Sequence, residues 1–222
     1  MAEVNLLKSL PKGKRNITSR ASVKTVENIR KSKEFGEMYF DGPREYGYGG
    51  YRYDGRWKSV AQDIVEYFKL KPGDRVLDIG CAKGFLVKDL LELGIDAYGI
   101  DVSKYALLHC EPEVIGRLQI GSAEDLPFPD NSFDAVIAIN SIHNLPRLRC
   151  MKAVQEMERL APGKGFIQVD SYHNEKQKEI FESWVLTAQF YDYPKGWIQL
   201  FTEAGYSGDW YWTVFDTDGS NI

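Results

Sequence analysis

From Trp57 onward, short apolar segments alternate with longer amphipathic ones, and this alternation constrains the fold more than any other feature. The expected strands are 75–79, 96–100, 117–120, 133–139 and 165–169. The expected helices are 57–69, 84–93, 103–110, 146–160, 174–188 and 195–204. This order predicts a Rossmann-like α/β fold, with a parallel sheet and helices on both faces. The aromatic end DWYWTVF suits one or two more strands, so we expect seven mostly parallel strands.

Composition excludes several classes of protein. The 222 residues carry a formal net charge of −4, which argues against a nucleic-acid binder. No run approaches the roughly 18 apolar residues of a membrane span, and no secretory signal is visible, so we expect a cytoplasmic location. The three cysteines, Cys81, Cys110 and Cys150, form no metal-spaced pair, and we expect no metal. The oligomeric state stays open.

Two segments precede this pattern. Residues 1–35 form a basic arm that is either solvated or folded over the active site or an anionic partner. Residues 36–57 are rich in tyrosine and glycine, and we expect a lid or substrate-binding wall because glycines allow turns while tyrosines offer flat apolar faces. The domain proper is expected over 58–222. The substrate-binding candidates in the lid are Tyr46, Tyr48, Tyr51, Tyr53, Arg56 and Trp57.

The first expected strand runs into VLDIGCAKGF, where a cofactor is expected because ligands bind beyond the carboxyl ends of such strands. Asp78 lies near the tip of this strand, and Gly80 and Gly84 let a ligand approach the backbone. The next strand ends at Asp101, where an acidic residue accepts hydrogen bonds from ribose hydroxyls. Both NAD and S-adenosylmethionine carry that ribose.

The glycine spacing separates these two cofactors. A dinucleotide site uses G-x-G-x-x-G to admit a pyrophosphate at a helix N-terminus, whereas Ala82 occupies the middle glycine position here. S-adenosylmethionine has no phosphate but has an α-amino group, which suits Asp78. The spacing therefore favours S-adenosylmethionine.

Four motifs in this order, D-x-G-x-x-x-G, GIDVS, SAEDLPF and NSFDAV, resemble those of class I S-adenosylmethionine-dependent methyltransferases over about residues 57–215. The segment FDGPREYGYGGYRYDGRW is similar to that of a bacterial subgroup associated with cell-surface sugar and polysaccharide pathways. The resemblance implies methyl transfer to a small soluble molecule, with no nucleic-acid or membrane partner.

The resemblance also implies roles for single residues. The turn from Gly80 to Gly84, with Cys81, and Asp78 would hold the methionine part of the cofactor, and Asp101 would bind the ribose. Around the adenine and the sulfonium, the implied residues are Val102, Ser122, Ala123 and Asn140. Two residues depart from the pattern, Ala82 at the middle glycine and Ser122 where many relatives have aspartate.

An oxygen or protonated nitrogen acceptor needs a base, and a histidine with a pKa near 6.5 suits that role. His143 and His173 follow the fourth and fifth expected strands and are the candidates, although either histidine is equally consistent with a structural role. Arg56 and Lys83 are candidates for pairing with the carboxylate of S-adenosylmethionine or with an acidic substrate, or are simply solvated. The alternatives are a protein or RNA methyltransferase, a binding subunit without catalysis and, least favoured, an NAD oxidoreductase.

Overall fold

The computed structural model describes residues 1–11 and 17–215. Its sheet has six strands in the order β3-β2-β1-β4-β5-β6, and every neighbouring pair is parallel. The strands are β1 (Arg75–Ile79), β2 (Asp96–Asp101), β3 (Leu118–Ile120), β4 (Ala135–Ile139), β5 (Gly165–Asp170) and β6 (Asp209–Thr213). The expected Rossmann-like α/β fold is confirmed.

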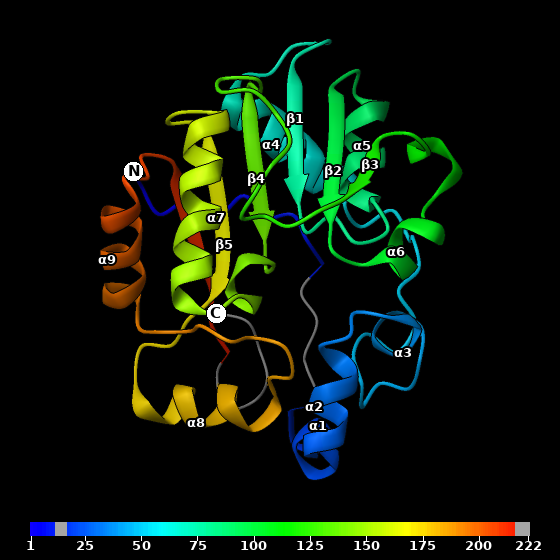
Figure 1. The fold of residues 1–222 in the computed structure, drawn as a ribbon, viewed down its shortest axis with the longest axis vertical. Helices are drawn as coiled ribbons and strands as arrows, with labels where there is room; N and C mark the ends of the chain where they lie inside the picture. The colour runs from blue at the N-terminus through cyan, green and yellow to red at the C-terminus, as the bar shows by residue number, and fades with distance from the viewer. Residues whose placement is uncertain (12–16, 216–222) are drawn as a thin grey trace.

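Helices cover both faces of the sheet (Figure 1). One face packs against α4 (Lys58–Phe68) and α5 (Phe85–Glu92), and the other against α7 (Arg147–Leu160) and α9 (Pro194–Ala204). The remaining helices are α1 (Ile17–Val23), α2 (Val26–Ser32), α3 (Glu37–Phe40), α6 (Lys104–Leu108), α8 (Glu175–Trp184) and the 3-10 turns η1 (Pro112–Val114) and η2 (Ile142–Asn144). No helix in the described part of the chain is long and apolar enough to cross a membrane.

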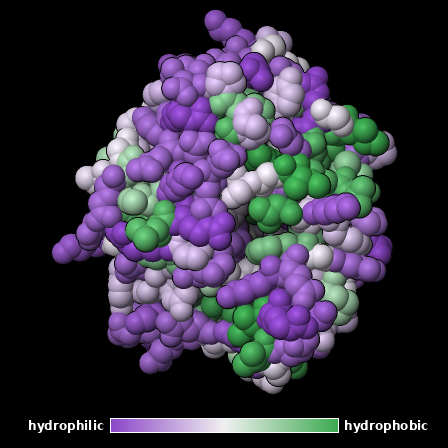
Figure 2. Space-filling model, viewed as in Figure 1, coloured by the Kyte–Doolittle hydropathy of each residue, from purple (hydrophilic) through white to green (hydrophobic). Residues whose placement is uncertain are grey.

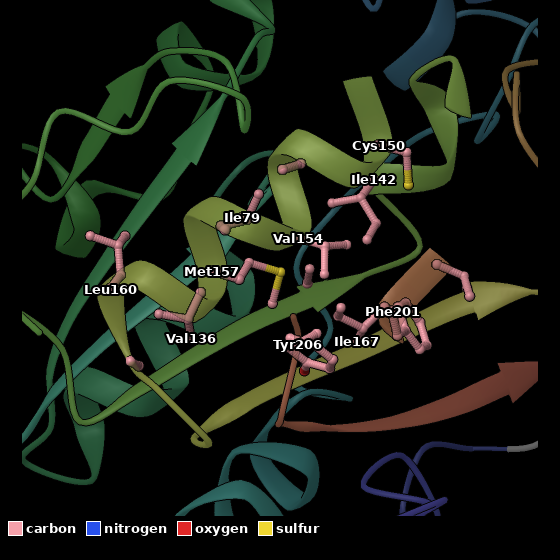
Figure 3. Packing of buried hydrophobic residues seen from close by; sticks show 14 of the residues in the cluster. Ile79, Val136, Ile142, Cys150, Val154, Met157, Leu160, Ile167, Phe201 and Tyr206 are labelled. Atoms are coloured by element: carbon pink, nitrogen blue, oxygen red, sulfur yellow. The ribbon is translucent and has the colours of Figure 1, made fainter. Parts of the chain in front are cut away.

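The larger part of the core lies between the sheet and α7. Figure 3 shows Val154 and Met157 of α7 lying over Val136 of β4 and Ile167 of β5. All four side chains are fully buried, and burial of each contributes roughly 1.5–3 kcal/mol. This packing fixes the positions of β4 and β5, whose carboxyl ends form part of the site.

The expected number of seven strands is wrong for the described residues, because the aromatic end supplies one strand and not two. After Thr213 the chain leaves the sheet, and Phe215 packs edge-on against Trp184 of α8. The edge of β6 is instead paired over a short stretch with the first residues of the chain. Val4 N–H donates to the Trp210 carbonyl over 2.8 Å, and Trp210 N–H donates to the Ala2 carbonyl over 3.1 Å.

The basic arm packs on the domain at both of its described ends. Leu6 is buried in the cluster beneath α4 and α5, while α1, α2 and α3 lie below the carboxyl ends of the strands (Figure 1). Lys12, Lys14 and Arg15 lie outside the described residues. The Tyr-rich segment contains the four-residue helix α3, which has no sequence period and was not expected.

Candidate functional site

A cleft with an empty volume of about 730 Å³ opens at the carboxyl ends of β1, β2 and β4. This is where the strand order reverses, since β1 pairs with β2 on one side and with β4 on the other. Figure 2 shows apolar surface gathered on this side of the molecule, above the N-terminal helices. The cleft is lined by Phe35, Tyr39, Phe40, Tyr48, Gly80, Ala82, Ile100, Asp101, Val102, Gly121, Ser122, Ala123, Asn140, Ser141, Ile142, Asn144 and Leu145.

The turn after β1 forms the floor of the cleft. Gly80 has φ of +77°, and a Cβ there would lie 2.2 Å from the Cβ of Ser141. Only glycine therefore fits, because the side chain of Ser141 fills the space that a Cβ would need. Ala82 also adopts the left-handed conformation, with φ of +50°, which costs an alanine roughly 1–2 kcal/mol. Strain of this kind is concentrated at functional sites.

Asp101 ends β2 and is held by two backbone N–H groups. Its Oδ2 accepts from Ala82 N–H and its Oδ1 from Ser103 N–H, both over 2.8 Å. Burial raises its pKa, while these hydrogen bonds oppose the shift. Each carboxylate oxygen keeps a further lone pair, so Asp101 can accept more hydrogen bonds from a ligand in the cleft.

Asp78 lies below the same turn and is only 6% exposed. Among the described residues nothing donates a hydrogen bond to its carboxylate. Burial and the negative charge of Asp101 raise the pKa of Asp78 to about 7. A buried carboxylate without a partner is costly, and a cation bound beside it would remove that cost.

The rim beyond β2 and β3 offers apolar contact. Val102 is 54% exposed and lies beside Gly121, Ser122 and Ala123 along the cleft. The Ser122 hydroxyl bonds to the Glu124 carboxylate, which is itself held by Arg149.

Asn140 follows β4 and lines the opposite side of the cleft. It has φ of +50°, and its N–H donates to the Gln168 carbonyl of β5 over 2.8 Å. Its Oδ1 accepts from the Thr213 hydroxyl over 3.1 Å. The next residue, Ser141, also lines the cleft and donates to the Ile79 carbonyl.

An aromatic wall closes the cleft from the N-terminal side. It consists of Phe35, Tyr39, Phe40 and Tyr48. Phe40 and Tyr48 stack with ring centroids 5.8 Å apart, and Tyr39 meets Phe40 edge-on at 5.1 Å. Burial raises the pKa of Tyr39 well above its ordinary value, so its phenol is neutral at physiological pH.

Hydrogen bonds connect the segment that carries this wall to the glycine turn after β1. Lys83 Nζ donates to Asp41 Oδ2 over 2.6 Å and to the Tyr51 carbonyl over 2.9 Å. Although burial alone would raise the pKa of Asp41, hydrogen bonds from Lys83, Tyr105 and the Tyr51 N–H lower it. Lys83 is 7% exposed and pairs within the chain, so the expectation of a solvated lysine is wrong.

Comparison with known proteins shows what the core is similar to. Residues 77–169, from β1 to β5, match the family model described as a methyltransferase domain. This part of the chain is therefore similar to a methyltransferase domain. Its match supports S-adenosylmethionine as the cofactor and accounts for the position of the cleft.

The chain is similar to several curated proteins. It is 32% identical over 131 residues to the demethylmenaquinone methyltransferase of Symbiobacterium thermophilum, a match that covers 53% of this chain and 50% of that protein. It is 31% identical over 150 residues to the 2-phytyl-1,4-naphtoquinone methyltransferase of Synechococcus elongatus, covering 60% and 62%. It is 35% identical to the probable tRNA methyltransferase 9B of Mus musculus, covering 57% and 27%. The match thus spans half of the length of the first of these relatives.

Two solved structures show the same fold. The YcgJ protein of Bacillus subtilis superposes with a TM-score of 0.53 at 20% identity, covering 65% of this chain and 66% of that one. A complex with the Trm112 methyltransferase activator of Haloferax volcanii contains a chain that superposes with a TM-score of 0.52 at 21% identity, covering 68% and 73%.

The residues around the cleft fit S-adenosylmethionine. The unpartnered carboxylate of Asp78 suits the α-ammonium group, and the spare lone pairs of Asp101 suit two ribose hydroxyls. Of the residues expected from the sequence, the cleft brings together Gly80, Asp101, Val102, Ser122, Ala123, Asn140 and Tyr48. Asp78 lies directly beneath them.

Other expected residues lie away from the cleft lining. Cys81 packs behind the turn against Gly99, and Gly84 caps α5. Tyr51 stacks on Phe85 and Tyr53 bonds to Asp89. The lid candidates that contact other parts of the chain are Tyr46, whose carbonyl accepts from Ser32, Arg56, which pairs with Asp54, and Trp57, which packs against the core.

The two histidines do not line the cleft either. His173 is exposed at the start of α8. His143 is 4% exposed, its Nδ1 accepts from the Asp170 N–H over 3.3 Å, and its Nε2 lies 3.6 Å from Asp170 Oδ2. Both ring nitrogens are therefore directed at Asp170. This arrangement favours a structural role over that of a general base.

Several lining residues were not found from the sequence. Phe35, Tyr39 and Phe40 come from a segment without periodicity, and Ser141, Ile142, Asn144 and Leu145 come from the loop after β4. The one signal for the second group was its position, because loops that follow strands at the carboxyl edge line such clefts.

Proposed function

We propose that this chain transfers a methyl group from S-adenosylmethionine to a small-molecule acceptor. The observation that carries the proposal is the pair of carboxylates at the tips of β1 and β2, Asp78 without a partner and Asp101 with spare lone pairs beside the cleft. When bound, the cofactor supplies an electrophilic methyl group on a sulfonium. The match to the methyltransferase domain supports this chemistry.

The proposed binding follows the lining of the cleft. Asp101 accepts hydrogen bonds from the ribose, and Asp78 pairs with the α-ammonium group. The turn from Gly80 to Gly84 passes close to the methionine part, and Asn140 faces its other side. Val102, Ser122 and Ala123 form the rim for the adenine.

We infer a neutral acceptor with a flat or ring-shaped apolar face. Tyr39, Phe40 and Tyr48 present aromatic surfaces, and no lysine or arginine among the described residues lines the cleft. A sugar ring fits such faces, in keeping with the surface-sugar resemblance, whereas a sugar acid would lack a cationic partner. Transfer to oxygen or nitrogen depends mainly on positioning, which can lower a barrier by several kcal/mol.

The Tyr-rich segment is proposed to close over the site. It supplies Phe40 and Tyr48 to the wall and is fastened to the glycine turn through Lys83. Closure would exclude water from the sulfonium. Limited proteolysis of this segment, with and without S-adenosylhomocysteine, tests the idea, and equal cleavage rates would count against it.

An RNA acceptor is the second candidate, because the chain is similar to the probable tRNA methyltransferase 9B. The net charge of −4 opposes it. Release of S-adenosylhomocysteine in the presence of transfer RNA, compared with a panel of small sugars and quinols, separates the two candidates.

Calorimetric titration with S-adenosylmethionine tests the proposal. Asp101→Ala is expected to weaken binding tenfold or more, since each charge-assisted hydrogen bond contributes about 1.5–3 kcal/mol. Asp96→Ala is the matched control, because Asp96 begins the same strand and bonds to Arg117 away from the cleft. Equal affinities of the two folded variants would refute the assignment of Asp101, and wild-type protein that does not bind would refute the function.

A further inference from the structure

A chain of polar side chains crosses the end of the sheet and ends at the cleft. Gln168 Nε2 of β5 donates to Thr213 Oγ1 of β6 over 2.9 Å, and Thr213 Oγ1 donates to Asn140 Oδ1 over 3.1 Å. Gln168 is 3% exposed and Thr213 is 2% exposed. These two residues therefore connect the outer strands to a residue of the cleft.

Stability alone does not account for this chain. Gln168 Oε1 is buried and has no hydrogen-bond partner among the described residues, so the network carries an unsatisfied group. The neighbours on the same face of these two strands are apolar or aromatic, because Phe166 of β5 is buried and Tyr211 of β6 packs against the same cluster. Apolar side chains of similar shape would fill the same space without that cost.

The geometry of Asn140 points to a function for the chain. Its backbone is in the left-handed region and is held by the Gln168 carbonyl, while its side-chain oxygen is held by Thr213. With Oδ1 engaged, the remaining hydrogen-bonding group of the side chain is the NH₂, which has two donors. Asn140 lines the cleft opposite the glycine turn, so a ligand oxygen can accept from these donors.

We propose that Gln168 and Thr213 are positioning residues that orient the Asn140 amide so that its N–H groups bind a carboxylate oxygen in the cleft. On the proposed function, that carboxylate belongs to the amino-acid end of the cofactor. Asp78 would hold the α-ammonium group, and Asn140 would hold the carboxylate from the other side. The amino-acid end would then be fixed by groups from β1, β4, β5 and β6 together.

The experiment uses two probes, S-adenosylhomocysteine and 5′-methylthioadenosine, which lacks the amino-acid end. Calorimetry measures the affinity of each for the wild type, Thr213→Val and Thr213→Ser. Thr213→Val is expected to weaken the binding of S-adenosylhomocysteine about fivefold, which is the effect of one hydrogen bond. The affinity for 5′-methylthioadenosine should not change. Thr213→Ser, which keeps the hydroxyl, is expected to bind within about twofold of the wild type.

A double-mutant cycle separates positioning from a general loss of structure. In an Asn140→Ala background, Thr213→Val is expected to have no further effect on S-adenosylhomocysteine. Any of three results would overturn the proposal. They are an equal loss of affinity for both probes, an additive loss of affinity in the double variant, and an unchanged affinity in Thr213→Val. Wild-type protein that binds neither probe would overturn the proposed function as well, so the two failures are distinguishable.

Discussion

The ammonium group of Lys83 lies 2.6 Å from Oδ2 of Asp41, which joins the glycine turn to the Tyr-rich segment. Lys83→Met removes this ion pair together with the bond to the Tyr51 carbonyl. We expect faster proteolysis of residues 42–56 and an affinity for S-adenosylhomocysteine about three- to tenfold lower, because only part of the about 1.5–3 kcal/mol that a charge-assisted hydrogen bond contributes is coupled to cofactor binding.

Lys58→Met is the control for this variant. Lys58 pairs with Glu92 between α4 and α5, outside the cleft. We expect its proteolysis pattern and its affinity to match the wild type. If Lys83→Met behaved in the same way, the link between the segment and cofactor binding would be refuted.

The raised pKa of Asp78 predicts an unusual dependence of folding stability on pH. Its pKa is about 7 in the folded protein and about 3.9 when unfolded. The folded state binds the proton of Asp78 more tightly than the unfolded state does. The contribution of this proton to the free energy of unfolding is therefore fully present below about pH 4 and is lost as the pH rises through 7. The loss reaches at most about 4 kcal/mol, at 1.36 kcal/mol per pKa unit. Asp78→Asn is expected to raise the melting temperature more at pH 8 than at pH 5, and an equal gain at both would contradict the shift.

Cofactor binding has the opposite dependence on pH. If the α-ammonium group pairs with ionised Asp78, binding releases the proton, so affinity rises roughly tenfold or more between pH 5.5 and 7.5. Calorimetry near pH 6 in two buffers of different ionisation enthalpy measures the released proton. Asp78→Asn should release none, and proton release that persisted in this variant would assign it to another group.

Gly80 and Gly116 form a matched pair for testing the floor of the cleft. Both have positive φ, +77° and +81°, but a Cβ at Gly116 meets nothing within 4 Å. Alanine at either position costs roughly 1–2 kcal/mol of backbone strain, and only Gly80→Ala also displaces Ser141. We expect Gly116→Ala to bind S-adenosylhomocysteine normally and Gly80→Ala to lose at least tenfold. Equal affinities of the two variants would show that the close contact between Gly80 and Ser141 does not matter for cofactor binding.

His143→Leu is expected to reduce stability more than cofactor affinity. It leaves the buried Asp170 carboxylate without its imidazole neighbour, at a cost of about 1–3 kcal/mol. Thermal denaturation measures this loss, and His173→Ala, at an exposed position, is the control. A stable His143→Leu protein with turnover reduced about 10²–10⁴-fold on its acceptor would restore His143 as a base.

Hydrophobic periodicity predicted the core strands well, because the same buried residues form the apolar pattern in the sequence and the paired strands of the sheet. The strand at Arg75–Ile79 has the expected bounds, since a charged turn precedes it and Gly80 ends it. Tertiary contacts overrode the pattern in α8, expected to reach 188. It ends at Trp184 because the following loop turns back, and the N–H groups of Gln189 and Phe190 donate to the His143 carbonyl.

The site could be predicted only where strand ends fix it. Asp101 and Asn140 line the cleft because each directly follows or ends a central strand. The aromatic wall depends on how residues 35–48 fold back, which Lys83, Asp41 and Ser103 determine through long-range hydrogen bonds. Composition identified that segment as important but could not separate Tyr48, in the cleft, from Tyr53, which bonds to Asp89 behind it.

The pairing of Ala2 and Val4 with Trp210 has a consequence for synthesis. Ala2 also bonds to Asp209, which is 207 residues away in sequence. During translation the first residues therefore leave the ribosome long before their partner strand exists, and closing so long a loop is slow. Until β6 is made, Leu6 has no completed surface to pack on. A chaperone that holds short apolar segments would find a target around Leu6 while the rest of the domain is being made.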